Sequence, residues 1–297
     1  MDAYLPNTTD MKNTIIFLAF SLVALFACNE QNKKNVTVKK VKQQPQRQQP
    51  KTVTYQLANT KQWLLTNKDS AGLDIVLAVN RTDTAGFKRM DSVIIPSDKS
   101  GDIAYYLPFP LQVPYLEAVD KIIFFSYPTQ TFGAYENGIL MYTGPTNMGR
   151  KLDQTPTGLF FTNWKAEQTT STFNDEWDLR WNFNIENKLG VGWHQYSLPG
   201  FPESHSCLRL QEKDARYLYE WADQWVLEGK ETVVANGTPV IVFGSYNFNA
   251  PKPWFQLITN AHALDITEAE IQQQTMPYLN KILTEQTKRE TVGPGKE

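Results

Sequence analysis

The chain has 297 residues, of which 41% are hydrophobic, 12% aromatic and 20% charged. A chain of this size is long enough for about two domains with a sizeable core, and its composition excludes a disordered chain and a disulfide scaffold. With 29 basic and 31 acidic residues the formal charge is −2, so no overall positive field indicates a nucleic-acid partner. Only two cysteines and three histidines are present, which makes each of them informative.

The N-terminus has the pattern of an export signal. An apolar run spans 14–27 and ends at Cys28. It is too short for a comfortable membrane span and has the length of a signal-peptide core. Residues 25–28 resemble a bacterial lipobox, in which the cysteine is lipidated and becomes the new N-terminus. We therefore predict a signal peptide at 1–27, with the true start at Met11, and a lipoprotein anchored in the bacterial envelope through Cys28 and facing the periplasm. An uncleaved anchor helix is the alternative.

Residues 28–52 are rich in glutamine, lysine and asparagine. Such a stretch has almost no apolar content to bury, so it should be a disordered basic tether. A basic tether suits a protein that stands off a membrane carrying anionic lipid or polymer, although a plain soluble spacer would have the same composition.

A small α/β domain is expected at 53–117. Its residues 73–80 have apolar positions at helical spacing, and 91–96 are typical of a short strand that ends at a proline. The segment 79–96 weakly resembles the second half of a LysM peptidoglycan-binding repeat. A domain with a packing role only is the alternative.

The rest of the chain is expected to be mainly β with peripheral helices. The Asn137-Gly138 pair favours the left-handed dihedrals of a two-residue hairpin between two apolar strands. An amphipathic helix is expected at 214–227, with Trp221 and Trp225 on its apolar stripe and Gly229 just past its end. Strands are expected at 121–126, before Glu136, at 139–142 and at 237–243, and a helical extension at 246–297 with Ile271, Met276, Leu279 and Ile282 as its apolar face.

The chemistry centres on Cys207, the only cysteine left after lipidation of Cys28. It cannot form an intramolecular disulfide, and a lone thiol in an oxidising compartment is either buried and inert or used as a nucleophile. Two of the three histidines, His194 and His205, lie within thirteen residues of it. Because a thiol with a pKa of about 8.5 is mostly protonated at neutral pH, a neighbouring imidazole can activate it by taking its proton.

At these residues the chain resembles the L,D-transpeptidase family. The mark of that family is a histidine, a variable loop, and Ser/Thr-His-Gly-Cys followed by an apolar residue and arginine or asparagine. Here His194 is followed, after nine residues, by Ser-His-Ser-Cys-Leu-Arg at 204–209, and 155–158 resemble the family's Thr-Pro-Thr-Gly strand motif. The resemblance covers about 118–245. Two departures are a short loop before the motif and Ser206 in place of the motif glycine.

The resemblance implies a β-sandwich catalytic domain that acts on peptidoglycan stem peptides. The family cleaves the bond after the third residue of a tetrapeptide stem, releases the terminal D-alanine and holds the rest as a cysteine thioester. By position in the motif, Cys207 would be the nucleophile and His194 its general base. The backbone carbonyl of Gln195 would orient that imidazole, and the N–H groups of Ser206 and Cys207 would form the oxyanion hole. No cofactor or metal is expected.

Four further residues are candidates for binding substrate, namely Ser204, His205, Arg209 and Trp193. The fixed fork of Arg209 suits bidentate pairing with a carboxylate, and a structural ion pair is the alternative. His205 is expected to shape the loop and contact substrate. Trp193 belongs to a set of tryptophans that could stack on sugars or pack in the core, together with Trp164, Trp177 and Trp181.

Other interpretations stay open at this point. A papain-like order would pair Cys207 with the downstream His262, and a zinc site would combine Cys207 with the two nearer histidines without an obvious fourth ligand. A non-catalytic wall-binding lipoprotein would explain Ser206 as the mark of a decayed site. The acyl acceptor is also open: an amine on a neighbouring stem gives a cross-link, a protein lysine gives wall anchoring, and water gives carboxypeptidase action.

Overall fold

The computed structural model describes residues 44–67, 72–170 and 178–293, which all belong to one compact unit. The predicted signal peptide, the predicted lipidation site Cys28 and the tether up to residue 43 lie outside the described residues. Within the described ranges, no helix combines the length and the apolar character that crossing a membrane requires.

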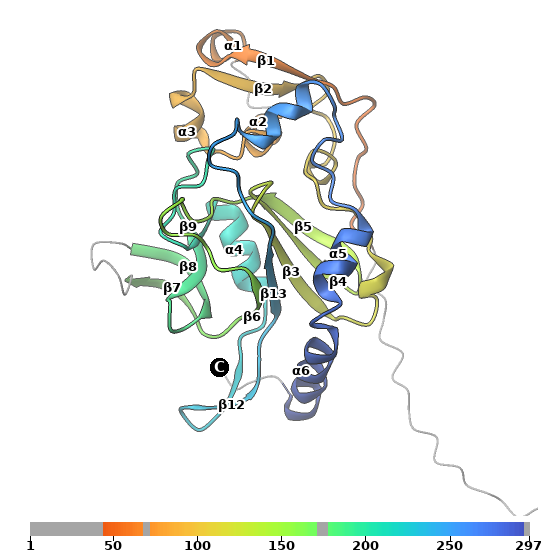
Figure 1. The fold of residues 1–297 in the computed structure, drawn as a ribbon, viewed down its shortest axis with the longest axis vertical. Coiled ribbons are helices and arrows are strands. Elements are labelled where there is room, and N and C mark those ends of the chain that lie inside the picture. The colour runs from red at the N-terminus through yellow and green to blue at the C-terminus, as the bar shows by residue number, and fades with distance from the viewer. Residues whose placement is uncertain (1–43, 68–71, 171–177, 294–297) are drawn as a thin grey trace, which may run out of the picture. The chain divides into compact units, whose positions relative to one another are not determined.

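A small α/β unit is present at the start of the described chain (Figure 1). Its two strands pair antiparallel, and its helices α2 and α3 pack their apolar residues against them. Val76, Phe87 and Val93 form the centre of this internal core. Ile75 and Ile94 point instead into a second cluster that includes Trp254 from the C-terminal segment. The unit therefore shares its core with the rest of the protein. Its elements are β1 (Tyr55–Asn59), α1 (Thr60–Thr66), α2 (Leu73–Val79), α3 (Thr84–Arg89) and β2 (Ser92–Pro96).

The last part of the predicted tether is fixed to this body, so the prediction of a disordered segment is wrong for residues 44–52. The guanidinium of Arg47 donates to the backbone carbonyls of Leu140 and Met141. It also lies 3.4 Å from the carboxylate of Asp102, and the N–H of Asp102 donates to the Gln48 carbonyl. These polar contacts order a stretch that has no apolar side chains to bury, which composition alone does not reveal.

Two sheets form the predicted β-sandwich. Parallel pairing joins β3 to β13 in one sheet and β9 to β10 in the other, and the remaining neighbours are antiparallel. Asn137 and Gly138 have φ of 48° and 76°, as the predicted hairpin requires. The five-stranded sheet has the order β5 (Ile139–Pro145), β4 (Thr131–Glu136), β3 (Lys121–Ser126), β13 (Pro239–Phe243) and β6 (Gly158–Phe161). The four-stranded sheet has the order β10 (Leu208–Leu210), β9 (Val191–Gln195), β8 (Asp178–Glu186) and β7 (Lys165–Thr170).

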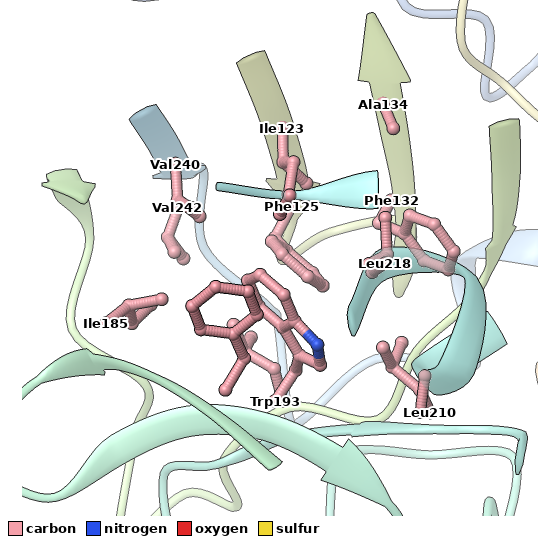
Figure 2. Packing of buried hydrophobic residues seen from close by; sticks show 14 of the residues in the cluster. Ile123, Phe125, Phe132, Ala134, Ile185, Trp193, Leu210, Leu218, Val240 and Val242 are labelled. Atoms are coloured by element: carbon pink, nitrogen blue, oxygen red, sulfur yellow. The ribbon is translucent and has the colours of Figure 1, made fainter. Parts of the chain in front are cut away.

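The main core lies between the two sheets (Figure 2). Side chains alternate between the faces of β3, so Ile123 and Phe125 point into this core, whereas Ile122 and Phe124 point to the opposite face. That second face is covered by the C-terminal helices, which contribute residues such as Ile271 to a second core. Burial on both faces explains why β3 is a continuous apolar run in the sequence.

Peripheral elements differ from the sequence expectation at two helix ends. Helix α4 (Glu212–Trp221) stops six residues early, because the chain becomes extended at Ala222 and continues into a hairpin of β11 (Val226–Glu228) and β12 (Thr232–Ala235). Trp225 therefore lies outside the helix, and Gly229, with φ of 66°, lies in the hairpin turn.

The C-terminal extension contains two α-helices rather than one continuous helical pattern. They are α5 (Glu268–Thr275) and α6 (Leu279–Val292), and they are separated at Pro277, which cannot continue a helix because it lacks an N–H. Met276 is 60% exposed and does not belong to the buried face, whereas Ile271 and Ile282 do. Three short 3-10 helices complete the fold, namely η1 (Ile103–Tyr105), η2 (Pro114–Leu116) and η3 (Pro253–Ile258).

Candidate active site

The candidate site is built on the two parallel strands β9 and β10. Their register pairs Trp193 with Leu208 and His194 with Arg209. Because successive side chains of a strand point to opposite faces, Trp193 and Leu208 enter the core, where both are fully buried. His194 and Arg209 therefore occupy the other face, and Cys207, which directly precedes β10, lies next to them.

His194 is buried and its imidazole is held in one orientation. Its Nδ1 lies 3.0 Å from the backbone carbonyl of Gln195, the contact that the motif resemblance implies. A carbonyl only accepts hydrogen bonds, so Nδ1 carries the proton and Nε2 keeps a free lone pair. Burial, together with the positive charge of Arg209, lowers the pKa of His194 to about 4, although the hydrogen bond to the Gln195 carbonyl acts in the opposite direction. The imidazole is therefore neutral at pH 7 and able to accept a proton.

Cys207 is the only free thiol in the described part of the chain. Burial raises its pKa, while the backbone N–H of Gly192 and the charge of Arg209 act in the opposite direction. A Cβ on Gly192 would lie 2.4 Å from the backbone oxygen of Phe183 on the neighbouring strand, so this strand position requires glycine. At neutral pH the thiol of Cys207 and the imidazole of His194 are thus both uncharged.

The turn that carries the thiol is tied down by Ser204. Its side chain is fully buried, and its Oγ donates to the Cys207 carbonyl at 2.5 Å. Its backbone N–H donates to the carbonyl of Met148 at 3.1 Å. Ser204 therefore holds the turn in place, and the prediction that it binds substrate is wrong, since no part of its side chain is exposed.

Ser206 has φ of 79°, a left-handed conformation that glycine adopts without strain and other residues adopt at a cost. The glycine in the family motif thus has a structural reason, and this chain places a serine in the same backbone conformation. A serine there still offers its backbone N–H to an oxyanion.

Thr155 holds the peptide between Ser206 and Cys207. Its Oγ1 donates to the Ser206 carbonyl at 2.8 Å and accepts from the N–H of Gly149 at 2.9 Å. In a trans peptide the C=O and N–H point in opposite directions, so fixing this carbonyl also aims the N–H of Cys207. Within the described ranges, neither the Ser206 nor the Cys207 N–H donates to a protein acceptor. Two unpaired backbone donors beside a nucleophile suit an oxyanion.

Thr155 belongs to the Thr-Pro-Thr-Gly motif, and its sequence context alone predicts no role for it. The threonine is buried and 51 positions from Ser206 in sequence, so the motif was the only signal that could have found it.

The other predicted substrate-binding residues have different environments. Trp193 is fully buried, with its ring centroid 4.8 Å from that of Phe183, so its predicted contact with substrate is wrong. His205 is half exposed and lies 3.9 Å from the carboxylate of Asp153. Trp164 is partly exposed and Trp181 partly buried, while Trp177 lies outside the described residues.

Arg209 adopts the structural ion pair that the sequence left as an alternative. Its Nη1 lies 3.6 Å from the carboxylate of Glu203, and its guanidinium lies 4.5 Å from the ring centroid of Tyr196. The Tyr196 ring in turn packs edge-on against His194. Arg209 is thus part of the wall beside the catalytic base, and its charge acts on both His194 and Cys207.

The alternative sites receive no support from the geometry. His262, the base of a papain-like order, lies on the C-terminal segment with its Nδ1 2.7 Å from Asp265. No cluster of three or more histidine, cysteine, aspartate and glutamate side chains suited to a metal ion occurs within residues 44–67, 72–170 and 178–293.

The strand arrangement and its motif agree with a known family. Residues 120–242 match the model of the YkuD family, the L,D-transpeptidase catalytic domain. This segment belongs to that family. The L,D-transpeptidase domain thus comprises both sheets of the sandwich, with β9, β10 and the motif cysteine near its C-terminal end.

Solved structures similar to this chain include L,D-transpeptidases from Mycobacterium smegmatis, Mycobacterium tuberculosis H37Rv and Stackebrandtia nassauensis. Their identities are 20%, 20% and 21%, with TM-scores of 0.34, 0.34 and 0.35. The similar region covers 42%, 42% and 43% of this chain and 59%, 58% and 57% of theirs, so less than two thirds of each relative is spanned. No curated protein matches the chain significantly.

Proposed function

We propose that the chain is a peptidoglycan L,D-transpeptidase that forms a thioester between Cys207 and a tetrapeptide stem. The observation that carries the proposal is the parallel pairing of β9 with β10, which sets His194 opposite Arg209, two residues after Cys207. The hydrogen bond of His194 to the Gln195 carbonyl supports it, because it leaves Nε2 free to act as a base. The match of 120–242 to the L,D-transpeptidase catalytic domain supports the substrate class.

In the first half of the reaction, Sγ of Cys207 attacks the carbonyl carbon of the third stem residue, and the thiol proton passes to Nε2 of His194. The N–H groups of Ser206 and Cys207 stabilise the resulting oxyanion, and each such donor is typically worth about 3 kcal/mol. Collapse of the intermediate breaks the C–N bond to the terminal D-alanine. His194 returns the proton to the departing amine, which leaves a thioester on Cys207.

In the second half, an amine attacks the thioester, His194 accepts its proton, and the thiol of Cys207 is restored. An amine on a neighbouring stem gives a cross-link, and we take this as the primary activity. A lysine of a wall-linked protein or a water molecule would use the same acyl-enzyme. Comparing the muropeptides of a deletion strain with those of its parent separates the three acceptors, through loss of 3–3 cross-links, loss of protein-linked stems or accumulation of tetrapeptides.

Acylation by a carbapenem tests the nucleophile and the base. The strained ring gives the thiolate an acyl group without a stem peptide, and intact-protein mass spectrometry measures the adduct. We expect an adduct on the wild type, none on Cys207→Ala and nearly none on His194→Ala. His205→Ala is the control and should still acylate when folded. An equal adduct on Cys207→Ala would remove the assignment, and wild-type acylation of His194→Ala would remove the base. No adduct on the folded wild type would favour the non-catalytic wall-binding alternative.

We further propose that Cys28 is the lipidation site and that the protein is anchored in the bacterial envelope, facing the periplasm. The apolar run 14–27 and the lipobox-like residues that end at Cys28 support this. Labelling with a palmitate analogue should be lost in Cys28→Ser, and retained labelling would contradict lipidation at this residue.

A further inference from the structure

A groove with a volume of about 690 Å³ lies between the small α/β unit and the loop that joins His194 to Ser204. One wall comes from the end of α3 and the start of β2, and the other comes from Tyr196, Phe201 and Glu203. Most of the first wall lies outside residues 120–242, so the L,D-transpeptidase domain alone does not form this groove.

The two walls are fastened together. Thr82 Oγ1 donates to the Leu198 carbonyl at 2.8 Å, and the N–H of Leu198 donates to the Asp83 carboxylate at 2.7 Å. The N–H of Asp83 also donates to the Leu198 carbonyl, at 3.1 Å. The small unit thus holds the middle of the loop between the base and the nucleophile turn, and the groove is formed before any ligand arrives.

Positive charge predominates along the groove. Arg89, Arg209 and Lys252 line it, against Asp91 and Glu203. The carboxylate of Glu203 forms an ion pair with Arg209, with 3.6 Å between Oε2 and Nη1. Arg89 and Lys252, in contrast, form no ion pair with any residue that the structure describes.

Lys252 is an unusual surface lysine. Its ammonium lies 5.6 Å from the ring centroid of Phe201, and burial lowers its pKa. A partly buried cation without a carboxylate partner loses hydration and gains little in return, so a bound anion would stabilise it.

The groove lies next to the residues that flank His194. The Tyr196 ring lines it and packs against the His194 ring, at 5.8 Å between centroids, and the Arg209 guanidinium lies 4.5 Å from the Tyr196 ring centroid. A peptide bound in the groove would therefore lie against the side chains that contact His194.

We propose that this groove binds a carboxylate-bearing stretch of the stem peptide, and that Arg89 and Lys252 are specificity-determining residues supplied from outside the L,D-transpeptidase domain. The proposal rests on the proposed function. It follows from the two cations that form no ion pair with a described residue, in a preformed groove whose lining residue Tyr196 packs against His194.

The test uses the purified full chain in detergent and two tetrapeptide stems, one with free carboxylates on its second and third residues and one with these groups amidated. D-alanine release is measured with each stem. We expect Arg89→Gln and Lys252→Met each to raise the KM for the free-acid stem about five- to tenfold, as expected for a charge-assisted contact, with kcat within about twofold. The KM for the amidated stem should not change. Lys88→Gln, on the same helix turn but outside the groove lining, is the matched control.

An effect on D-alanine release assigns the groove to the donor stem. Unchanged KM values in both variants would overturn the proposal, as would equal increases for both stems. Calorimetric binding of both stems to Cys207→Ala separates this proposal from the proposed function. If the wild type releases no D-alanine but the free-acid stem binds more tightly through Arg89, the function fails and the groove assignment stands.

Discussion

Replacing Ser206 by glycine should stabilise the protein and leave its chemistry nearly unchanged. Ser206 has φ of 79°, and a non-glycine residue in this region costs about 1–2 kcal/mol. Glycine removes that cost but loses more conformational freedom on folding, about 0.5–1 kcal/mol. The net stabilisation should be about 0.5–1 kcal/mol, which corresponds to a rise in Tm of roughly 1–4 °C for a protein of this size.

The effect on the reaction should be small, because the oxyanion donors are backbone N–H groups and Thr155 holds the Ser206 carbonyl whatever the side chain is. We expect D-alanine release and carbapenem acylation to change by less than about tenfold, or ~1.4 kcal/mol in transition-state free energy.

Thermal and urea unfolding measure the first effect, and steady-state release of D-alanine from tetrapeptide muropeptides measures the second. Ser206→Ala is the control, since alanine keeps the Cβ and should give no stabilisation. If alanine stabilises as much as glycine, backbone strain is not the cause. A wild type with no detectable turnover that is switched on by Ser206→Gly would refute the proposed activity of the natural site and favour a decayed one.

Three further predictions concern the titration and positioning of the site. The pKa of His194 is about 4, so the rate of carbapenem acylation should be nearly constant from about pH 5.5 to 8 and fall only as pH drops toward 4. A midpoint near pH 6.5 in the acylation rate would contradict a buried neutral base. Thr155→Val should lower the rate of carbapenem acylation about tenfold or more, whereas Thr155→Ser should retain it, because only serine keeps the hydroxyl that orients the Ser206 peptide. Equal acylation rates in the two variants would contradict a positioning role for Thr155. Burial raises the pKa of Asp214 to about 7, so this carboxyl stabilises the fold in its protonated form, and stability is lost as pH rises from about 4 through 7. Asp214→Asn should therefore gain Tm relative to the wild type as pH rises from 5 to 8.5, and a difference that does not depend on pH would contradict this.

Local sequence predicts one contact of the candidate site that the structure shows. The imidazole of His194 and the carbonyl of Gln195 belong to neighbouring residues, so their contact needs no tertiary information. The hairpin at Asn137-Gly138 was predicted for the same reason, since its dihedrals are a property of two adjacent residues.

The sequence leaves Trp193 between sugar stacking and core packing, and its strand face decides for the core. Trp193 neighbours His194, so in a strand the two side chains must point in opposite directions, and only one of them can belong to the site. Its aromatic side chain would suit sugar stacking, but Trp193 is fully buried in the core between the two sheets, where it is among the largest buried side chains.

What the sequence by itself determined is the sheet-rich class and the family motif around Cys207, because both follow from short-range patterns. The tertiary structure decided everything that depends on residues far apart in the chain. It placed Thr155 against the Ser206 peptide, fixed Arg47 against the edge of β5, and fastened Thr82 to Leu198 across 116 positions to form the charged groove. These contacts are hydrogen bonds between distant segments, and no periodicity or composition encodes them, because they arise only once the packed sheets bring those segments together.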